Sequence, residues 1–320
     1  LSESFHVLAT QGTKNTPLWI SRLILSELTN KHEVFIVEMW AYEKWDIKQL
    51  CDIVWPNISI LTGITLQHLE RFKNLDNIID AKFEILECLW KDDFAVVDST
   101  TEGVQRWLSE KNLEVKNIIE VKKWTKYSYQ EKLWWIKFEI EWNTIKTKLL
   151  SNYIGETLQI CYHVWKYLWQ NIKDFKSWAE KIDFVKHRMQ LIHNPQSNVF
   201  VIDDSFNGNL EWIAAIFDLM KYAPFHGRKI LVAGWVVELG DKTESVHLKL
   251  GRQMSQLADM VLLVKWPIGT SLKKWLLEAK YHAKQIKMYG SPLWLHEDLK
   301  NIIQSGDMVI FQNDLPDNYL

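Results

Sequence analysis

Glycine is scarce in this chain of 320 residues, which has 12 glycines and 18 tryptophans. Globular proteins use glycine at roughly 7 % and tryptophan only rarely. Three tryptophans stand where turns are expected: Trp45 before a helix start, Trp90 before a Lys-Asp-Asp run, and Trp142 between two alternating segments. Glycine suits such turns because it adopts positive φ angles without steric cost. We therefore hypothesise that a codon meaning glycine in the source was rendered as tryptophan. The alternative is a tryptophan-rich protein that packs these rings in its cores.

Cysteine is also rare, and the chain lacks a long apolar run and an excess of basic residues. Cys51, Cys88 and Cys161 are isolated, which argues against a disulfide framework and against a zinc site. No stretch has the length and apolarity of a membrane-spanning helix, and the first residues do not resemble a signal peptide. The net charge of -2 gives no basic field for nucleic acid or an anionic membrane. We expect a monomeric, cytoplasmic protein.

Short apolar runs alternate with helical patterns along most of the chain, which is typical of βαβ units around a mostly parallel sheet. A helix is expected from Thr16-Pro17 to about Leu28, and another is capped by Asn74. From about residue 115 to 150 the pattern changes to period-two alternation, which predicts an antiparallel sheet. The remaining expected elements of this part are strands at 33–39, 57–62 and 94–98 and helices at 46–54, 155–169 and 175–184.

A polar segment with a proline, residues 193–197, precedes a fresh βα series. Its strands are expected at 229–233, 260–264, 285–289 and 308–311, after one that starts at Val199. The length of the chain also favours two domains. We predict an α/β protein with a parallel-sheet domain and a small antiparallel sheet over residues 1–194. A smaller Rossmann-like domain follows over residues 195–320, with a hinge near Asn194.

Polar side chains that could carry chemistry stand at the ends of expected strands. Residues 201–209 read Val-Ile-Asp-Asp-Ser-Phe-Asn-Gly-Asn, a strand that ends in carboxylates and amides, where α/β proteins bind ligands. Glu38 ends another strand and could hold Mg²⁺ there, although such a residue is often a solvated surface group. His68 occupies a similar place, with an ordinary loop residue as the alternative. Lys82 lies among apolar helix positions, where a lysine usually extends its ammonium to water.

Taken together, these segments resemble the Mur ligase family over nearly the whole chain. The segments similar to the family's central ATPase domain are Asn15-Thr16-Pro17-Leu18, Val37-Glu38-Met39, Leu61-Thr62-Gly63, residues 68–72 and residues 81–85. Those similar to its linker and C-terminal domain are Arg188-Met189-Gln190, residues 203–207, and Glu238-Leu239-Gly240 with His247. Glycine in place of Trp40, Trp45 and Trp235 would bring the chain closer to the family pattern.

The resemblance implies a peptide-bond-forming ligase of peptidoglycan synthesis that uses ATP and Mg²⁺ and activates a carboxylate as an acyl phosphate. The Asp-Asp-Ser-Phe-Asn block is similar to that of the branch that adds D-alanyl-D-alanine to UDP-N-acetylmuramoyl-tripeptide, and it disfavours a folylpolyglutamate or cyanophycin type of ligase. The site residues implied are Glu38, His68 and Lys82 (as a carbamate) for catalysis and metal binding, Arg188, Asp203 and Asn207 for the nucleotide or dipeptide, and Asn15 and Thr16 for the substrate.

Two features of the family are missing from the sequence. The family carries a phosphate loop ending in Gly-Lys-Thr or Gly-Lys-Ser upstream of the segment that matches Asn15, and a UDP-binding N-terminal domain. Without such a loop, we expect no ATP hydrolysis by this chain alone. The sequence leaves two explanations open: an N-terminally incomplete ligase, or a catalytically silent Mur-type module that binds a precursor or a partner.

Overall fold

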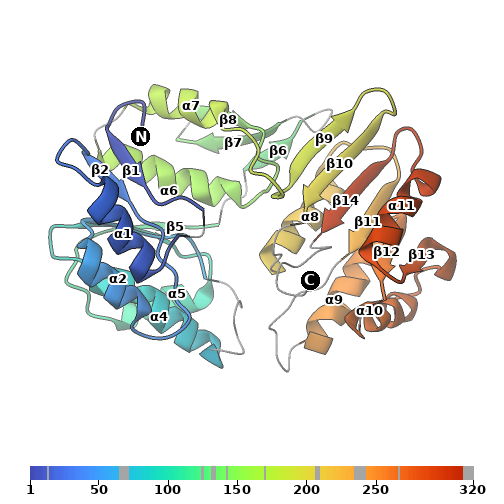
Figure 1. Cartoon of the computed structure of the whole chain (residues 1–320), viewed down its shortest axis with the longest axis horizontal. Coiled ribbons are helices and arrows are strands. Elements are labelled where there is room, and N and C mark those ends of the chain that lie inside the picture. The colour runs from blue at the N-terminus through green and yellow to red at the C-terminus, as the bar shows by residue number, and fades with distance from the viewer. Residues whose placement is uncertain are drawn as a thin grey trace. The chain divides into compact units, whose positions relative to one another are not determined.

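The computed structural model describes residues 1–12, 14–64, 72–123, 126–130, 135–141, 143–168, 171–205, 210–233, 243–265 and 267–312. The chain divides into two compact units (Figure 1). Unit 1 comprises residues 1–123 and 156–172, and unit 2 comprises residues 124–155 and 173–320. Both are built from helices packed on sheets, which confirms the predicted α/β class with parallel sheets and a small antiparallel sheet.

The described part of unit 1 contains two parallel sheets. Strand β1 (Val7–Ala9) pairs with β2 (Val34–Ile36), and β3 (Ile58–Leu61) and β5 (Asn117–Val121) flank the central β4 (Phe94–Asp98). Alternate side chains of β4 fill two cores. Ala95 and Val97 pack in the larger one, with α1 (Pro17–Glu27), α2 (Asp46–Val54), α4 (Leu75–Glu87) and α5 (Glu102–Glu110). Phe94 and Val96 pack against α6 (Ile154–Tyr167).

Several predicted elements of unit 1 are confirmed, and one strand assignment is wrong. Asn74 caps α4, because its side chain accepts a hydrogen bond from the amide of Asn77 at 2.8 Å. The period-two region predicted to form an antiparallel sheet from about residue 115 includes β5. That strand instead pairs in parallel with β4. Among the described residues, the antiparallel sheet comprises β6 (Tyr127–Tyr129), β7 (Ile136–Ile140) and β8 (Asn143–Thr147), which belong to unit 2.

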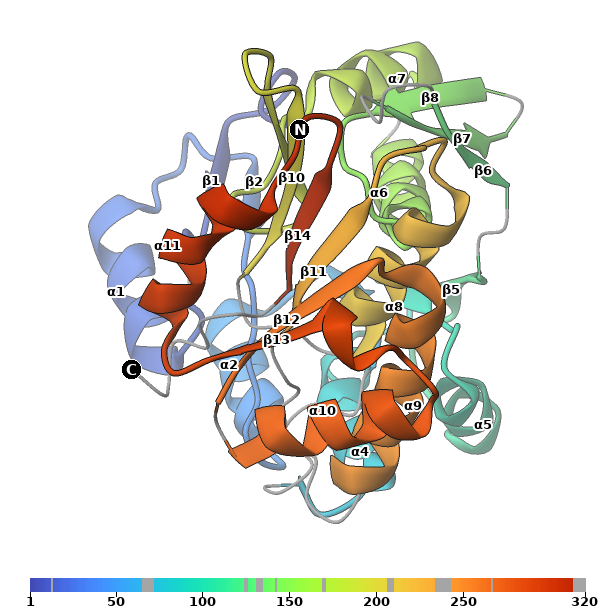
Figure 2. The same ribbon diagram turned by 90° about the vertical axis from the view of Figure 1, so that its right-hand side faces the viewer.

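The large sheet of unit 2 has the strand order β13-β12-β11-β14-β10-β9. Its members are β9 (Gln190–Asn194), β10 (Val199–Asp204), β11 (Lys229–Ala233), β12 (Met260–Val264), β13 (Ile286–Tyr289) and β14 (Met308–Gln312). All neighbouring pairs are parallel except β9 and β10. Figure 2 shows α11 (Pro292–Ile302) on one face, and α8 (Leu210–Tyr222), α9 (Thr243–Leu257) and α10 (Pro267–Glu278) on the other.

Residues 195–198 form the turn of the β9–β10 hairpin. Asn198 takes a positive φ of 50° in this turn, and its carbonyl accepts a hydrogen bond from the amide of Gly306 at 2.9 Å. The segment interpreted from the sequence as a polar linker is therefore part of a sheet. The domain boundary predicted between residues 194 and 195 falls within this hairpin, and a hinge at Asn194 stays a prediction.

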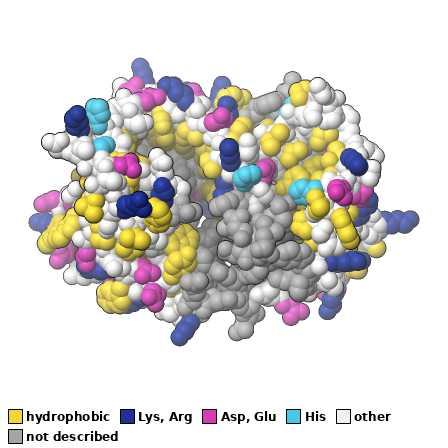
Figure 3. All heavy atoms as spheres, viewed as in Figure 1, with side chains coloured by type: hydrophobic (Ala, Val, Ile, Leu, Met, Phe, Trp, Pro, Cys, Tyr) yellow, Lys and Arg dark blue, Asp and Glu magenta, His cyan; other side chains and the backbone are white. Residues whose placement is uncertain are grey.

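The described surface carries charges of both signs. Figure 3 shows lysine and arginine side chains interspersed with aspartate and glutamate on the face in view. No helix among the described residues is long and apolar enough to cross a membrane.

The small sheet is tied to α8 within unit 2, because the hydroxyls of Tyr127 and Tyr129 donate to the carboxylate of Asp218 at 2.8 and 2.9 Å.

Candidate functional site

A strand, a loop and a helix follow one another at residues 7–27 of unit 1. This is the local arrangement in which phosphate-binding loops occur, because the free amides of the helix N-terminus face the loop. Gly12 has a positive φ of 58° in the loop, and Thr16 is the N-cap residue of α1. Residues 10–16 read Thr-Gln-Gly-Thr-Lys-Asn-Thr, without Gly-Lys-Thr or Gly-Lys-Ser. Asn15 and Thr16 thus lie at the N-terminus of α1, and their role in substrate binding stays a prediction.

Glu38 follows β2 at the edge where β1 also ends. Its amide donates a hydrogen bond to the Oγ1 atom of Thr10 at 3.0 Å, which holds the two strand ends together. The Glu38 side chain is exposed. Among the described residues, no group of three or more His, Cys, Asp and Glu side chains is placed to hold a metal ion. The magnesium site assigned to Glu38 stays a prediction, and its other expected ligand, His68, lies outside the described residues.

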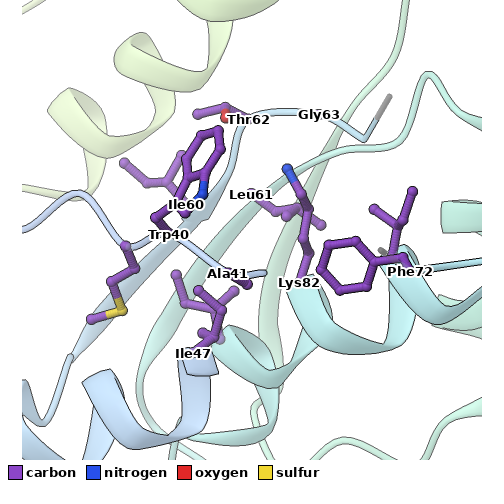
Figure 4. Close-up of a pocket in the computed structure, with 12 residues that line it drawn as sticks. Trp40, Ala41, Ile47, Ile60, Leu61, Thr62, Gly63, Phe72 and Lys82 are labelled. Carbon is purple, nitrogen blue, oxygen red and sulfur yellow. The ribbon is translucent and has the colours of Figure 1, made fainter. Parts of the chain in front are cut away.

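Lys82 lies on α4 and lines a cavity of about 100 Å³ in unit 1. The cavity is bounded by the segments after β2 and β3 and by α4, and its other lining residues include Trp40, Thr62, Gly63 and Phe72. Figure 4 shows the ammonium of Lys82 reaching toward Gly63, with the indole of Trp40 beside Thr62 in the same cavity. Lys82 is half-buried rather than extended into solvent. Its position supports a role in a pocket, although carbamylation stays a prediction.

Asp98 is a site candidate that the sequence reasoning missed. It ends β4 and is 7 % exposed, and burial raises the pKa of its carboxyl group. Its Oδ1 atom accepts a hydrogen bond from the amide of Thr100 at 2.9 Å. Its Oδ2 atom lies against Gly63, a lining residue of the Lys82 cavity. The signal was available, because Asp98 is the last residue of the apolar strand predicted at 94–98.

A second group of candidate residues lies in unit 2, at the end of β10. Asp203 accepts a hydrogen bond from the hydroxyl of Ser205 at 2.7 Å, and its other oxygen lies 2.8 Å from Nδ1 of His187. The amide of Ser205 also donates to Asp203 at 3.2 Å. Neighbouring groups of the chain thus satisfy both oxygens of Asp203. Its predicted part in nucleotide binding stays a prediction, as does that of Asn207, which lies outside the described residues.

Asp204 is the more unusual of the two adjacent carboxylates. It is 1 % exposed, and its Oδ1 atom accepts a hydrogen bond from the amide of Met189 at 3.0 Å. Its Oδ2 atom has no hydrogen-bond partner among the described residues. Burial raises the pKa of Asp204 to about 7, although the nearby Arg188 opposes the shift. A buried oxygen without a donor is costly, so this atom is placed to accept a hydrogen bond from a ligand.

Arg188 lies beside Asp204 on the segment that leads into β9. Its guanidinium lies 4.2 Å from the ring centre of Trp212 on α8, in a cation–π arrangement. Burial lowers the pKa of Arg188, while the charge of Asp204 raises it. The flanking residues His187 and Met189 have positive φ angles of 59° and 46°. Strained backbone at both neighbours of one arginine is typical of residues held in place for binding.

The other segments behind the family resemblance are placed as follows. His247 lies on α9, buried, with its Nδ1 atom 2.7 Å from the carbonyl of Thr243, and burial lowers its pKa. Residues 238–240 and Trp235 lie outside the described residues. The site residues that the structure describes are thus divided between the two units.

Family models match both parts of the chain. Residues 1–162 match the Mur ligase middle domain, and residues 187–312 match the Mur ligase glutamate ligase domain. The crystal structure of MurF ligase from Thermotoga maritima in complex with ADP is similar, with a TM-score of 0.79 and 23 % identity. The similarity covers 98 % of this chain and 71 % of that one, and it shows the fold.

Curated relatives agree with these matches. UDP-N-acetylmuramoyl-tripeptide–D-alanyl-D-alanine ligase from Haemophilus influenzae is 25 % identical over 273 residues, and the enzyme of that name from Rickettsia prowazekii is 26 % identical over 265 residues. The alignments cover 79 % and 78 % of this chain, and the chain spans 56 % and 57 % of the length of these relatives. The resemblance inferred from the sequence is confirmed: the chain belongs to the Mur ligase family.

Proposed function

We propose that the protein acts as an ATP-dependent ligase that joins D-alanyl-D-alanine to UDP-N-acetylmuramoyl-tripeptide in peptidoglycan synthesis. The buried Oδ2 atom of Asp204, which has no hydrogen-bond partner among the described residues, carries the proposal together with the nearby Arg188. The two supply an acceptor and a cation in one place. The family membership and the names of the curated relatives support this choice of reaction.

The residues around Asp204 fit a nucleotide. The Oδ2 atom of Asp204 can accept a hydrogen bond from a sugar hydroxyl, and Arg188 can face a phosphate oxygen. A buried carboxylate whose pKa is about 7 gains from such a donor, because a hydrogen bond to the charged form offsets its desolvation. Arg188, Asp203, Asp204 and Asn207 would together hold the nucleotide in unit 2.

The reaction transfers the γ-phosphoryl group of ATP to the carboxylate of the tripeptide. The amine of D-alanyl-D-alanine then attacks the acyl phosphate, and a peptide bond forms as inorganic phosphate leaves. Negative charge develops on the phosphoryl group and on the carbonyl oxygen, so cationic side chains and positioned donors contribute more than a protein nucleophile. Among the described residues, Arg188 in unit 2 is a cation suited to this task. Lys82 in unit 1 is one only as the ammonium, because its carbamate would be an anion.

Magnesium is expected for a reaction of this kind, and Glu38 and His68 are its proposed ligands. The described donors do not form a complete site by themselves, because no cluster of three or more suitable side chains is present among them. Asp98 is a further carboxylate in the same unit, beside the Lys82 cavity.

A second candidate function is that of a catalytically silent Mur-type module that binds the precursor. It is kept as a candidate because the sequence contains no Gly-Lys-Thr or Gly-Lys-Ser segment, with which the family's phosphate loop ends. A lysine at the end of such a loop normally reaches the β- and γ-phosphates. The two candidate functions differ in one measurable outcome: the ligase forms the joined product, and the silent module does not.

Two measurements test the proposal. Titration calorimetry with ADP should show binding to the protein and a loss of at least ten-fold in affinity for Arg188→Ala and Asp204→Asn. Lys274, whose side chain is exposed on α10, provides the control, and Lys274→Ala should bind ADP as the parent protein does. Incubation of the protein isolated from its source organism with ATP, UDP-N-acetylmuramoyl-tripeptide and D-alanyl-D-alanine should yield the joined product, detected by mass spectrometry. Binding without product would favour the silent module, and no binding of ADP would contradict both the nucleotide site and the ligase.

A further inference from the structure

Trp55 occupies a backbone position that suits glycine. It is the residue after the end of α2, in the left-handed region at φ 54° and ψ 64°, and its amide donates to the carbonyl of Cys51 at 2.8 Å. This is the usual helix-ending motif, in which glycine predominates because a Cβ atom is strained there. Pro56 follows directly, as is common after such an end. The indole itself is 69 % exposed and fills no core.

Trp45 is held in a similar conformation at the other end of α2. It has a φ of 81° and a ψ of -6°, and its side chain is 63 % exposed. Its amide donates to Oε1 of Glu84 at 2.6 Å, and the amide of Lys48 donates to Oε2 at 3.0 Å. Glu84 is 2 % exposed and lies on α4. Because the buried carboxylate fixes the backbone of residue 45, the left-handed conformation is set by the fold rather than by the tryptophan.

Trp40 stands in a different setting, inside the cavity that Lys82 lines. Figure 4 shows its indole beside Ile60 and Thr62, across the cavity from Lys82. The remaining space of about 100 Å³ is well below the roughly 300–1,000 Å³ of a typical ligand pocket. A residue without a side chain at position 40 would add the volume of the indole to this cavity.

Not every tryptophan has this character. Trp107 on α5 is 6 % exposed, packs against Phe83 with ring centres 3.8 Å apart, and donates from Nε1 to Asp80 at 3.1 Å. The Trp107 ring thus packs in a core, and its indole N–H has a hydrogen-bond acceptor, as is usual for a buried tryptophan. The structure thus separates tryptophans that pack from those whose backbone or surroundings require a smaller residue.

We propose that positions 40, 45 and 55 are occupied by glycine in the working protein, and that residue 40 controls the size of the pocket around Lys82. The proposal for positions 45 and 55 depends only on backbone geometry. The proposal for position 40 rests on the proposed function, because it assumes that the Lys82 pocket admits a ligand.

Peptide mass spectrometry on the protein isolated from its source organism tests the identity of the three residues. Glycine at positions 40, 45 and 55 is expected. Tryptophan at positions 45 and 55 would overturn the conformational argument, and tryptophan at position 40 would overturn the argument on the pocket.

Recombinant variants test the backbone argument separately. Trp45→Gly and Trp55→Gly should each unfold about 2–4 °C above the matched Trp45→Ala and Trp55→Ala variants, because alanine keeps the Cβ strain and glycine removes it. Trp107→Gly is the control and should unfold at a lower temperature than the parent protein. Equal midpoints for the glycine and alanine variants would contradict the proposal.

Chemical labelling tests the pocket without requiring ligase activity. The rate of acetylation of the Lys82 amine by a small acylating reagent, followed by peptide mass spectrometry, should rise several-fold in Trp40→Gly. Trp40→Phe keeps the cavity filled and should react as the parent protein does, while Lys274 reports the reactivity of an exposed lysine in every sample. Equal rates at Lys82 in all three proteins would overturn the role of residue 40. Faster acetylation of Lys82 in Trp40→Gly, together with no joined product in the ligase assay, would support the role of residue 40 and contradict the proposed reaction.

Discussion

Arg228 holds the buried carboxylate of Asp307 with two nitrogens, from Nε to Oδ1 at 2.9 Å and from Nη2 to Oδ2 at 2.6 Å. Asp307 is 2 % exposed, and its Oδ2 atom also accepts a hydrogen bond from the amide of Gln304 at 2.7 Å. The hydrogen bond with Asp307 raises the pKa of Arg228. The pair joins the start of β11 to the segment that enters β14.

Substitution of Arg228 should therefore weaken unit 2. Arg228→Ala leaves Asp307 without its two charged donors, and the free energy of unfolding is expected to fall by about 2–3 kcal/mol. Arg228→Lys keeps the charge but not the paired geometry, so a smaller loss is expected. Urea denaturation measures both, and an Arg228→Ala midpoint equal to that of the parent protein would contradict the assigned role.

Asp204 should make stability depend on pH. Burial raises its pKa to about 7 in the folded protein, against about 3.9 in an unfolded chain. The folded state therefore binds more protons between these two values, and the free energy of unfolding should fall as the pH rises from about 4 to about 7. The decrease in the free energy of unfolding that Asp204 causes over this pH range is on the order of 3–4 kcal/mol. Denaturation at a series of pH values measures it, and Asp204→Asn should remove this part of the slope. A slope that is unchanged in Asp204→Asn would show that other groups cause it.

Glu84 should stabilise the start of α2 through its two hydrogen bonds to backbone amides. Glu84→Gln places an amide group against one of these N–H donors, so the free energy of unfolding should fall by about 1–3 kcal/mol. Glu87→Gln, on the same helix, is the control. Glu87 is exposed and contacts Lys111 only at 3.7 Å, so a change within about 0.5 kcal/mol is expected. Similar losses in both variants would point to a general effect of charge on α4.

Gly63 and Gly12 provide a matched pair of glycines with positive φ. A Cβ atom at Gly63, where φ is 131°, would lie 3.2 Å from Oδ2 of Asp98, whereas one at Gly12 would meet nothing within 4 Å. Gly12→Ala should cost about 1 kcal/mol of backbone strain, and Gly63→Ala about 1–3 kcal/mol because a contact is added. Thermal unfolding compares the two variants, and a midpoint for Gly63→Ala above that for Gly12→Ala would contradict the geometry around Asp98.

The strands whose bounds the sequence predicts best are those buried on both faces. Strands β4, β11 and β12 begin and end at the predicted residues, because each is a short, nearly continuous apolar run. Edge strands are harder to predict. Strand β5 alternates like a half-buried strand, and its sequence does not reveal that its partner is β4 in parallel. Strand β9 reads Gln-Leu-Ile-His-Asn, and only its pairing with β10 distinguishes it from a linker.

The candidate site was predicted in part. The block at the end of β10 was identified from its polar residues, but the sequence favoured Asp203 over Asp204. Side chains alternate along a strand, so Asp204 shares a face with Ile202, which is fully buried. Which face is buried depends on the packing of the helices around the sheet, and a single sequence does not contain that information. The left-handed backbone at Trp45 was expected from the turn pattern, but its cause, the carboxylate of Glu84, lies 39 residues away in the sequence.

The chain crosses between the two units after residues 123, 155 and 172. Neither unit is therefore a single continuous stretch, and one protease cut at any crossing cannot release either unit whole. An N-terminal fragment ending at residue 123 lacks Ile160 and Val164 of α6, which cover Phe94 and Val96 of β4. Such a fragment would expose this apolar face, and aggregation is the expected result. A soluble version of unit 1 needs residues 156–172 rejoined to it, so the interrupted path of the chain determines which pieces of this protein can be made separately.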